Sequence, residues 1–283
     1  MNAPSTQIQI AFDRLLMPIS QTRQTFILED GSGNSLTPAI AYDPYTRVVT
    51  IVPPTPVLEG GQSYQLFIAS PSGPKDPNGL RAIDGAPIDP TIKQPLIIPV
   101  PMTIPSGPTL PVIDYCTDIP AVFQHCAGSD CHIGSPPPPA TGLLLDTPED
   151  IQATACNRTA EGSNTGPSLG PNNVPIVTTF GIDMPIIDQN NADPANSWLM
   201  YKILLAKPIA SVPAATSNYA VAWQPLTPDE RARLANLVPG REMPFPSVPT
   251  QSPEMNQSAL EDVDYETLSL WIAQGAKLEQ CNP

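Results

Sequence analysis

The sequence is short of apolar runs, basic residues and aromatic side chains, and these shortages exclude several classes of protein. No run of about 18 apolar residues occurs, so no transmembrane helix is predicted. Only 13 Lys and Arg stand against 27 Asp and Glu, and this balance argues against a surface for nucleic acid or other phosphate groups. With only 6 Phe, 7 Tyr and 3 Trp, the core has room for a large flat cofactor.

Proline is abundant instead, with 39 among 283 residues. Because 41% of the chain is hydrophobic and only 14% is charged, we predict a folded chain with long proline-pinned loops rather than disorder. The start "MNAPSTQIQI" lacks the charged and apolar regions of a signal peptide, so the chain is either cytosolic or a mature form with an added Met. Five cysteines without thioredoxin-like or zinc-finger spacing favour an oxidising compartment, periplasmic or extracellular.

Residues 1–105 show the alternation of half-buried β-strands. In "QIQIAF", Ile8, Ile10 and Phe12 alternate with polar partners. The segments "TFILED", "RVVTIVP" and "SYQLFIA" are rich in β-branched and aromatic residues and are bounded by Gly and Pro. We therefore expect an all-β N-terminal domain.

One tyrosine in this region carries a more specific signal. In "VLEGGQSYQL", Tyr64 follows a glycine pair at the start of a strand, as in the tyrosine corner of Ig-like sandwiches. The N-terminal region resembles the bacterial Ig-like domains of secreted and surface-layer proteins in the order of four segments, "DGSG", "YDPYTRVVTIVPP", "VLEGGQSYQL" and "DPNG". This resemblance implies an Ig-like sandwich. Asp76, Asn78 and Asp84 offer oxygen ligands for calcium, but a plain turn is favoured because an EF-hand loop needs more ligands at fixed spacing.

The proline-rich stretch "PLIIPVPMTIPSGPTLP" marks the boundary, and we expect a semi-rigid linker over 106–115. Helical periodicity follows over 116–283. Four helices are predicted. The first lies in "DIPAVFQHC" with Asp118 as N-cap, and the second covers 193–207 with Asp193 as N-cap. The third covers 227–238 with a capping box from Thr227, and the fourth covers 265–276 and ends at Gly275.

The segment "QHCAGSDCHIG" (124–134) is the strongest functional signal. Cys126 and Cys131 are separated by four residues, and His132 follows at once, whereas the usual haem-attachment signature has two residues between the cysteines. Two thioethers would tie the chain to the edge of a haem and bring the histidine under the iron. Gly128 permits the outward bulge that the longer spacing requires.

A second axial ligand is then needed on the opposite face of the iron. His125, the other histidine of the chain, is tied to the side of His132. A methionine therefore remains, as in the His/Met pair of cytochromes c. Met184 in "GIDMPII" and Met243 in "PGREMPFP" are the candidates, since a following proline stiffens each loop.

Read together, "C…CH…GLLLD…DPANSWLMYKIL…LTPDERARL…MP…YETLSLWIAQGA" resembles the monohaem cytochrome c domains of secreted and surface proteins of bacteria. The resemblance implies Met243 as distal ligand, since the family's ligand loop leads into the C-terminal helix, and a haem edge lined by 143–145. It also implies that Trp271 and Ile272 pack near Val122 and Phe123. The chain departs from the family in its C-x4-C-H spacing and in placing "LTPDERARL" before "MP".

Within this resemblance, Cys116, Cys156 and Cys281 remain after haem attachment, and Cys116–Cys281 is the favoured disulfide because the termini of a domain often lie close together. Other readings of the motif stay open. Cys126 and Cys131 can form a small disulfide loop. They can also bind zinc with His132, with Cys156 as a fourth ligand.

We therefore expect one covalent haem c, bound by Cys126, Cys131, His132 and Met243, in an exported electron-transfer protein without enzymatic activity. The Ig-like domain would be a spacer or docking module. The alternative is a non-haem structural or adhesive surface protein whose degenerate cytochrome-like domain is held by disulfides. The sequence identifies neither the redox partner nor the mode of anchoring, so outer-membrane or cell-surface association and self-association stay open.

Overall fold

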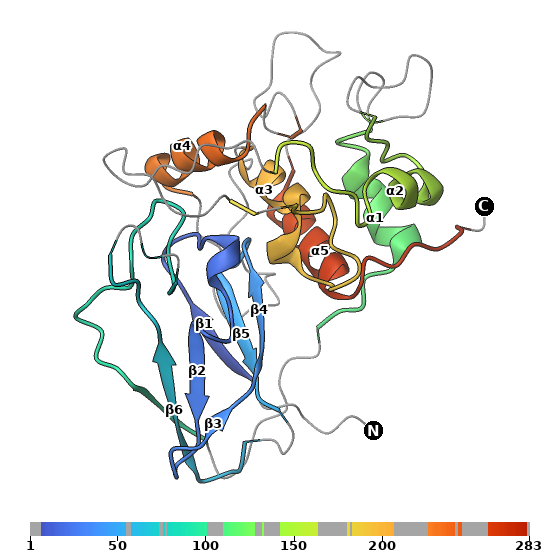
Figure 1. The fold of residues 1–283 in the computed structure, drawn as a ribbon. Coiled ribbons are helices and arrows are strands. Elements are labelled where there is room, and N and C mark those ends of the chain that lie inside the picture. The colour runs from blue at the N-terminus through green and yellow to red at the C-terminus, as the bar shows by residue number, and fades with distance from the viewer. Residues whose placement is uncertain are drawn as a thin grey trace. The chain divides into compact units, whose positions relative to one another are not determined.

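A computed structural model describes residues 7–54, 58–73, 76, 78–100, 110–127, 132, 142–163, 180–181, 183–206, 226–240, 243–244 and 260–281 (Figure 1). The described chain divides into two compact units. The sheet unit contains the residues up to Leu110 without Pro44–Thr46, and also Phe180. The helical unit contains Pro44–Thr46 and the other described residues from Pro111 onward. The fold combines two antiparallel sheets with, in the described ranges, five α-helices.

The sheet unit has one sheet of three strands in the order β1-β5-β4 and one of four in the order β3-β2-β6-β7. All of their pairings are antiparallel. The strands are β1 (Ile8–Ala11), β2 (Phe26–Glu29), β3 (Ser35–Leu36), β4 (Ala39–Asp43), β5 (Val48–Val52), β6 (Ser63–Ile68) and β7 (Leu96–Pro99).

Alternation along the strands builds the core of this unit. In β6, Tyr64, Leu66 and Ile68 are buried while the residues between them are partly exposed. Phe26 and Leu28 of β2 are fully buried and pair with Ile68 and Leu66. Because side chains point to alternate faces of a strand, this register brings all four apolar residues to the same face.

The sequence did not predict three of the strands, β3, β4 and β7. The expected proline-rich boundary contains β7, which pairs with β6 so that Tyr64 lies opposite Ile98 and Ser63 opposite Pro99. Proline cannot donate to a neighbouring strand, and β7 tolerates it because it lies at the end of the strand order.

The hydroxyl of Tyr64 accepts a hydrogen bond of 2.9 Å from the backbone N–H of Glu59. A tyrosine that caps backbone five residues upstream is the contact expected of a tyrosine corner. In the loop considered for calcium, the Asp76 carboxylate accepts hydrogen bonds from Ser72 and from the backbone N–H of Asn78. Asp84 instead pairs with Arg14. These contacts are those of a self-capped turn.

The helical unit contains α1 (Tyr115–Phe123), α2 (Pro148–Thr154), α3 (Trp198–Leu204), α4 (Pro228–Leu237) and α5 (Asp262–Ala273), with a 3-10 turn, η3 (Pro194–Asn196), before α3. None of the described helices is long and apolar enough to cross a membrane. In α4, Thr227 and Glu230 form the predicted capping box. Gly275, with φ of 93°, follows the end of α5 as predicted.

Three of the predicted helix limits were wrong. The first helix begins at Tyr115, where Asp114 accepts from the N–H of Thr117, so Asp118 lies in the first turn and is not the N-cap. Asp193 is an N-cap as predicted, but it caps η3, and Ser197 separates this turn from α3. The last helix begins at Asp262, three residues before the predicted start. α2 was not predicted.

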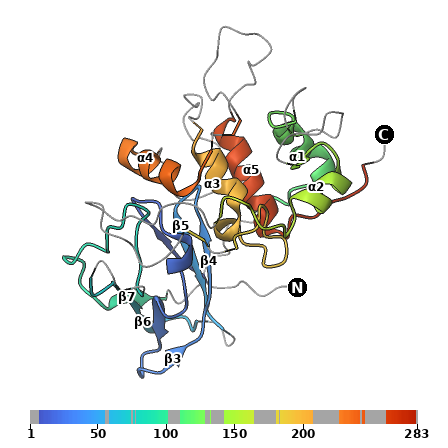
Figure 2. The same ribbon diagram turned by 45° about the horizontal axis from the view of Figure 1, so that its top comes forward.

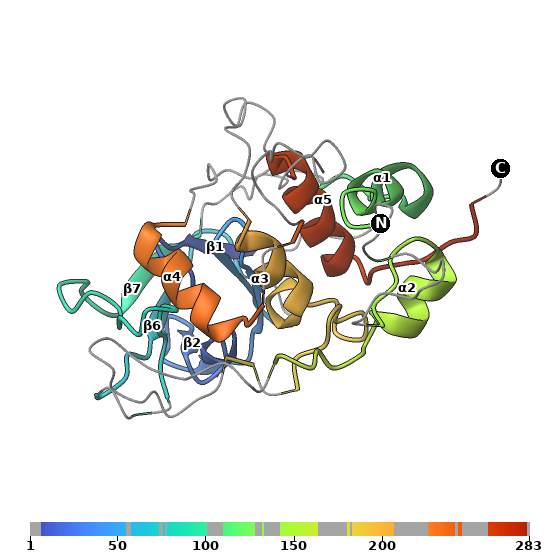
Figure 3. The same ribbon diagram turned by 90° about the horizontal axis from the view of Figure 1, so that it is seen from above.

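In the helical unit, α5 lies between α1 and α3 (Figures 2 and 3). Phe123 of α1 meets Trp271 of α5 edge to face, with ring centroids 5.9 Å apart, so the predicted packing of Trp271 beside Phe123 is confirmed. On the other side, the hydroxyl of Tyr265 donates to the carbonyl of Ile203 in α3. These contacts make α5 the central helix of the described unit.

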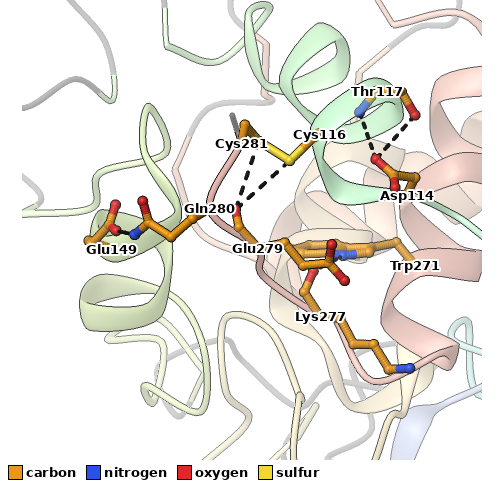
Figure 4. The surroundings of a disulfide bond; sticks show 9 residues. All are labelled: Asp114, Cys116, Thr117, Glu149, Trp271, Lys277, Glu279, Gln280 and Cys281. Atoms are coloured by element: carbon orange, nitrogen blue, oxygen red, sulfur yellow. Dashed lines mark hydrogen bonds between the residues drawn. A yellow bond between two sulfur atoms is a disulfide. The ribbon is translucent and has the colours of Figure 1, made fainter. Parts of the chain in front are cut away.

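The predicted disulfide between Cys116 and Cys281 is present, with the two Cα atoms 5.4 Å apart. Figure 4 shows that it joins the first turn of α1 to the segment that follows α5. In that segment, the carbonyl of Lys277 accepts a hydrogen bond of 2.9 Å from the indole of Trp271. The disulfide and the hydrogen bond from the Trp271 indole together hold the segment 277–281 against α1 and α5.

Candidate functional site

A cavity of about 660 Å³ lies within the helical unit. Its lining is mainly apolar, with Leu143 and Leu145 from the segment before α2, Ile186 from the loop before η3, and Trp198 and Leu199 from α3. A cavity of this size and polarity suits a large, mostly apolar ligand.

Three of the residues predicted to bind haem line this cavity, namely Cys126, His132 and Met243. They are distant in sequence, since Met243 lies 111 positions after His132. Cys126 is buried in the turn that follows α1, where its N–H bonds to the carbonyl of Phe123. The fold therefore brings a thiol, an imidazole and a thioether to one apolar space.

Main-chain hydrogen bonds hold the backbone of His132. Its N–H donates to the carbonyl of Cys126 at 3.1 Å, and its carbonyl accepts from the N–H of Leu145 at 2.8 Å. The histidine is thus fixed beside Cys126 on one side and beside a cavity-lining leucine on the other.

The imidazole of His132 is oriented as well. Its Nδ1 lies 3.0 Å from the carbonyl oxygen of Leu143. Because a carbonyl can only accept, Nδ1 carries the proton in this contact, and Nε2 keeps its lone pair. Burial lowers the pKa of His132, against a smaller raising effect of this hydrogen bond. The ring is therefore neutral at pH 7, which is the form that binds metals.

The two candidate methionines lie in different surroundings. Met243 is partly exposed and lines the cavity, and its N–H lies 3.5 Å from the carbonyl of Lys202 in α3. Met184 is fully buried and does not appear among the described lining residues. Its side chain packs against Gly181, where an added Cβ would lie 2.5 Å from the Met184 methyl carbon.

Other predicted residues are placed as follows. Leu143 and Leu145 line the cavity, while the backbone of Leu144 bonds to the Thr154 hydroxyl. His125 is half-buried in the turn that follows α1. Cys131 lies outside the described residues.

Charged residues that the sequence did not single out also line the cavity. They are Arg158, which follows α2, Glu161 and Lys202 of α3. Isolated charges follow no pattern in the sequence, so only the fold could reveal them. Gly162 lines the same region, and a Cβ there would lie 2.9 Å from the Trp198 ring, so glycine permits this close approach.

The structure bears only in part on the two alternative interpretations of the motif, a zinc site and a Cys126–Cys131 disulfide. Burial raises the pKa of the Cys156 thiol to about 11, and Cys156 is not among the described residues that line the cavity with Cys126 and His132. Within the described ranges, no three His, Cys, Asp or Glu side chains gather to hold a metal ion. The alternative Cys126–Cys131 disulfide depends on Cys131, outside those ranges.

No protein-family model matches the chain, and no curated protein matches it either. The function must therefore be argued from the cavity and its residues.

Proposed function

We propose that the helical unit is a cytochrome c-like domain that carries one covalent haem c and transfers electrons. The observation that supports this best is the shared cavity, into which the fold brings Cys126, His132 and Met243 from distant parts of the chain. A bound haem supplies one-electron exchange at its iron, and the His/Met pair is the ligand set of cytochromes c.

The residues present fit this group. The cavity of about 660 Å³ is lined largely by aliphatic side chains and by the Trp198 ring, which suits a flat macrocycle. His132 presents a neutral imidazole whose Nδ1–H is held by a main-chain carbonyl, and a hydrogen bond of this kind fixes the ring orientation of a metal ligand.

Each residue has a separate task in this proposal. Cys126 and Cys131 would hold the group through thioethers, and His132, through Nε2, and Met243 would supply ligands to its iron. Pro244, directly after the methionine, is buried and stiffens the loop that presents the sulfur. Because the protein would supply two ligands to the iron, this set of residues favours electron transfer over enzymatic catalysis.

The sheet unit would be an Ig-like spacer or docking module, as its tyrosine corner and two antiparallel sheets suggest. Export to the periplasm or cell surface is part of the same proposal. The Cys116–Cys281 disulfide supports it, because disulfides persist mainly in oxidising compartments.

The absorption spectrum and the mass of the denatured protein test the proposal. We expect Soret and alpha bands, and a mass that exceeds the polypeptide by one haem. A colourless protein with the bare polypeptide mass would refute it and favour a structural or adhesive surface protein held by its disulfide.

A matched pair of variants tests the axial histidine. His132→Ala should abolish the low-spin spectrum, while His125→Ala, which removes an imidazole that is not among the described lining residues, should preserve it. The opposite result would show that His132 is not the ligand.

A further inference from the structure

Charge is distributed unevenly in the helical part of the chain. Residues 111–283 contain 19 Asp and Glu but only 7 Lys and Arg. Five of these basic residues are described, namely Arg158, Lys202, Arg231, Arg233 and Lys277. Two of the five, Arg158 and Lys202, line the cavity, and Glu161 supplies the one carboxylate among the described lining residues. The described part of the lining therefore has two cations and one carboxylate, in a strongly acidic unit.

Arg158 is held in place by its own backbone surroundings. Its Nε donates to the carbonyl of Ala153 at 2.9 Å, and Ala153 lines the cavity as well. A bond through Nε fixes the plane of the guanidinium and directs its two terminal nitrogens, the pair that binds carboxylates in a fork.

Lys202 brings the second cation from α3. Its ammonium donates to the carbonyl of Pro239 at 2.8 Å, and a Cβ on Gly240 would lie 3.1 Å from the same nitrogen. Both Pro239 and Gly240 line the cavity. The contact therefore holds the ammonium beside the cavity.

We propose that Arg158 and Lys202 form the anion-binding end of the cavity and hold the two propionate carboxylates of the haem. This inference rests on the proposed function. Iron protoporphyrin is apolar over most of its surface and carries both carboxylates on one edge. Ionised carboxylates are costly to bury without a charged partner, and Arg158 and Lys202 are the two Lys or Arg side chains among the described lining residues. The two cations thus orient the macrocycle.

The test compares two ligands on the full-length chain prepared without its cofactor. The dissociation constants of ferric iron protoporphyrin IX and of its dimethyl ester are measured by absorbance titration. The ester keeps the ring and the iron but has no carboxylate charge. Wild type should bind the free acid at least about tenfold more tightly, which corresponds to one charge-assisted hydrogen bond or more.

Arg158→Gln and Lys202→Gln should each lower this preference by about tenfold, mainly by weakening binding of the free acid. Because the preference is a ratio between two ligands on one protein, effects of a substitution on the fold or on the nearby Met243 cancel. Lys277→Gln removes an exposed cation that is not among the described lining residues, and Arg23→Gln does the same in the sheet unit. Both should keep the wild-type ratio.

Equal binding of acid and ester by wild type would overturn the inference and leave the haem proposal standing. If Arg158→Gln and Lys202→Gln both keep the wild-type ratio of the two dissociation constants, the inference is likewise overturned and the haem proposal stands. Failure of wild type to bind either ligand would overturn the proposed function, and the inference with it.

Discussion

Loss of the Cys116–Cys281 disulfide is expected to destabilise the helical unit strongly while leaving its fold intact. The bond joins residues separated by 165 positions. In the chain-entropy account, closing a loop of this length lowers the entropy of the unfolded chain by an amount worth about 5 kcal/mol at 25 °C. The contact of Phe123 with Trp271 does not depend on the bond, so the loss acts mainly through the unfolded state.

The double variant Cys116→Ser/Cys281→Ser and wild type are compared by urea unfolding. All three tryptophans lie between 198 and 271, so their fluorescence reports on this part of the chain and not on the sheet unit. We expect the free energy of unfolding to fall by about 3–5 kcal/mol. With an m value of about 2 kcal/mol/M, the midpoint should fall by about 2 M.

Wild type that has been reduced and alkylated should unfold like the double variant, because both lack the same cross-link. A loss below about 1 kcal/mol in the double variant would refute the reasoning. It would mean that the unfolded chain is already restrained, for example by residual structure that keeps its ends close.

Three further predictions concern single residues. Met243→Ala should abolish the weak sulfur-to-iron absorption band of the oxidised protein, and Met184→Ala should keep it; the reverse would make Met184 the ligand. Burial raises the pKa of Asp193 to about 6, from 3.8 in an unfolded chain, so its protonation stabilises the fold below pH 4 and this contribution is lost as the pH rises through 6. Between pH 4 and pH 7, the unfolding free energy of wild type should therefore fall by at most about 3 kcal/mol relative to that of Asp193→Asn. If the unfolding free energies of the two proteins change in parallel with pH, this prediction is wrong. Tyr64→Phe removes the hydrogen bond to the Glu59 N–H and should cost about 1 kcal/mol in urea unfolding followed by the far-ultraviolet circular dichroism of the strands. An unchanged stability would show that this hydrogen bond contributes nothing.

Local signals in the sequence were reliable where a side chain caps its own helix. Thr227 and Glu230 lie three residues apart and satisfy each other's backbone, so the start of α4 could be predicted. The same Thr-Pro-acidic pattern begins at Thr147, and it would have revealed α2. For α1 the predicted cap was Asp118, but Asp114 is the cap because its side chain accepts from the N–H of Thr117, and Pro120 lies inside the helix.

The proline-rich strand β7 shows what the local sequence cannot predict, namely which strand an extended segment pairs with. Prolines predict an extended linker, and β7 is indeed extended, but its pairing with β6 depends on a segment about 30 residues earlier in the chain. An isolated segment cannot show whether an extended chain will find an edge to pair with.

Three of the four residues predicted to bind haem line one cavity, and the sequence alone could not show this arrangement. The spacing of Cys126, Cys131 and His132 identifies the motif, and a following proline narrows the methionines to Met184 and Met243. That Met243 lines the cavity while Met184 packs against Gly181 follows from tertiary contacts alone.

The surroundings of His132 have a consequence for how this site tolerates mutation. Among the described residues, its hydrogen-bond partners are the carbonyls of Cys126 and Leu143 and the N–H of Leu145, all of them main-chain groups. Replacing the leucine side chains leaves these groups in place, and at position 145 only proline removes the donor. The orientation of the imidazole is therefore encoded in the path of the backbone. Side-chain substitutions at positions 143 and 145 would therefore change the lining of the cavity but keep the hydrogen bonds that orient the ring.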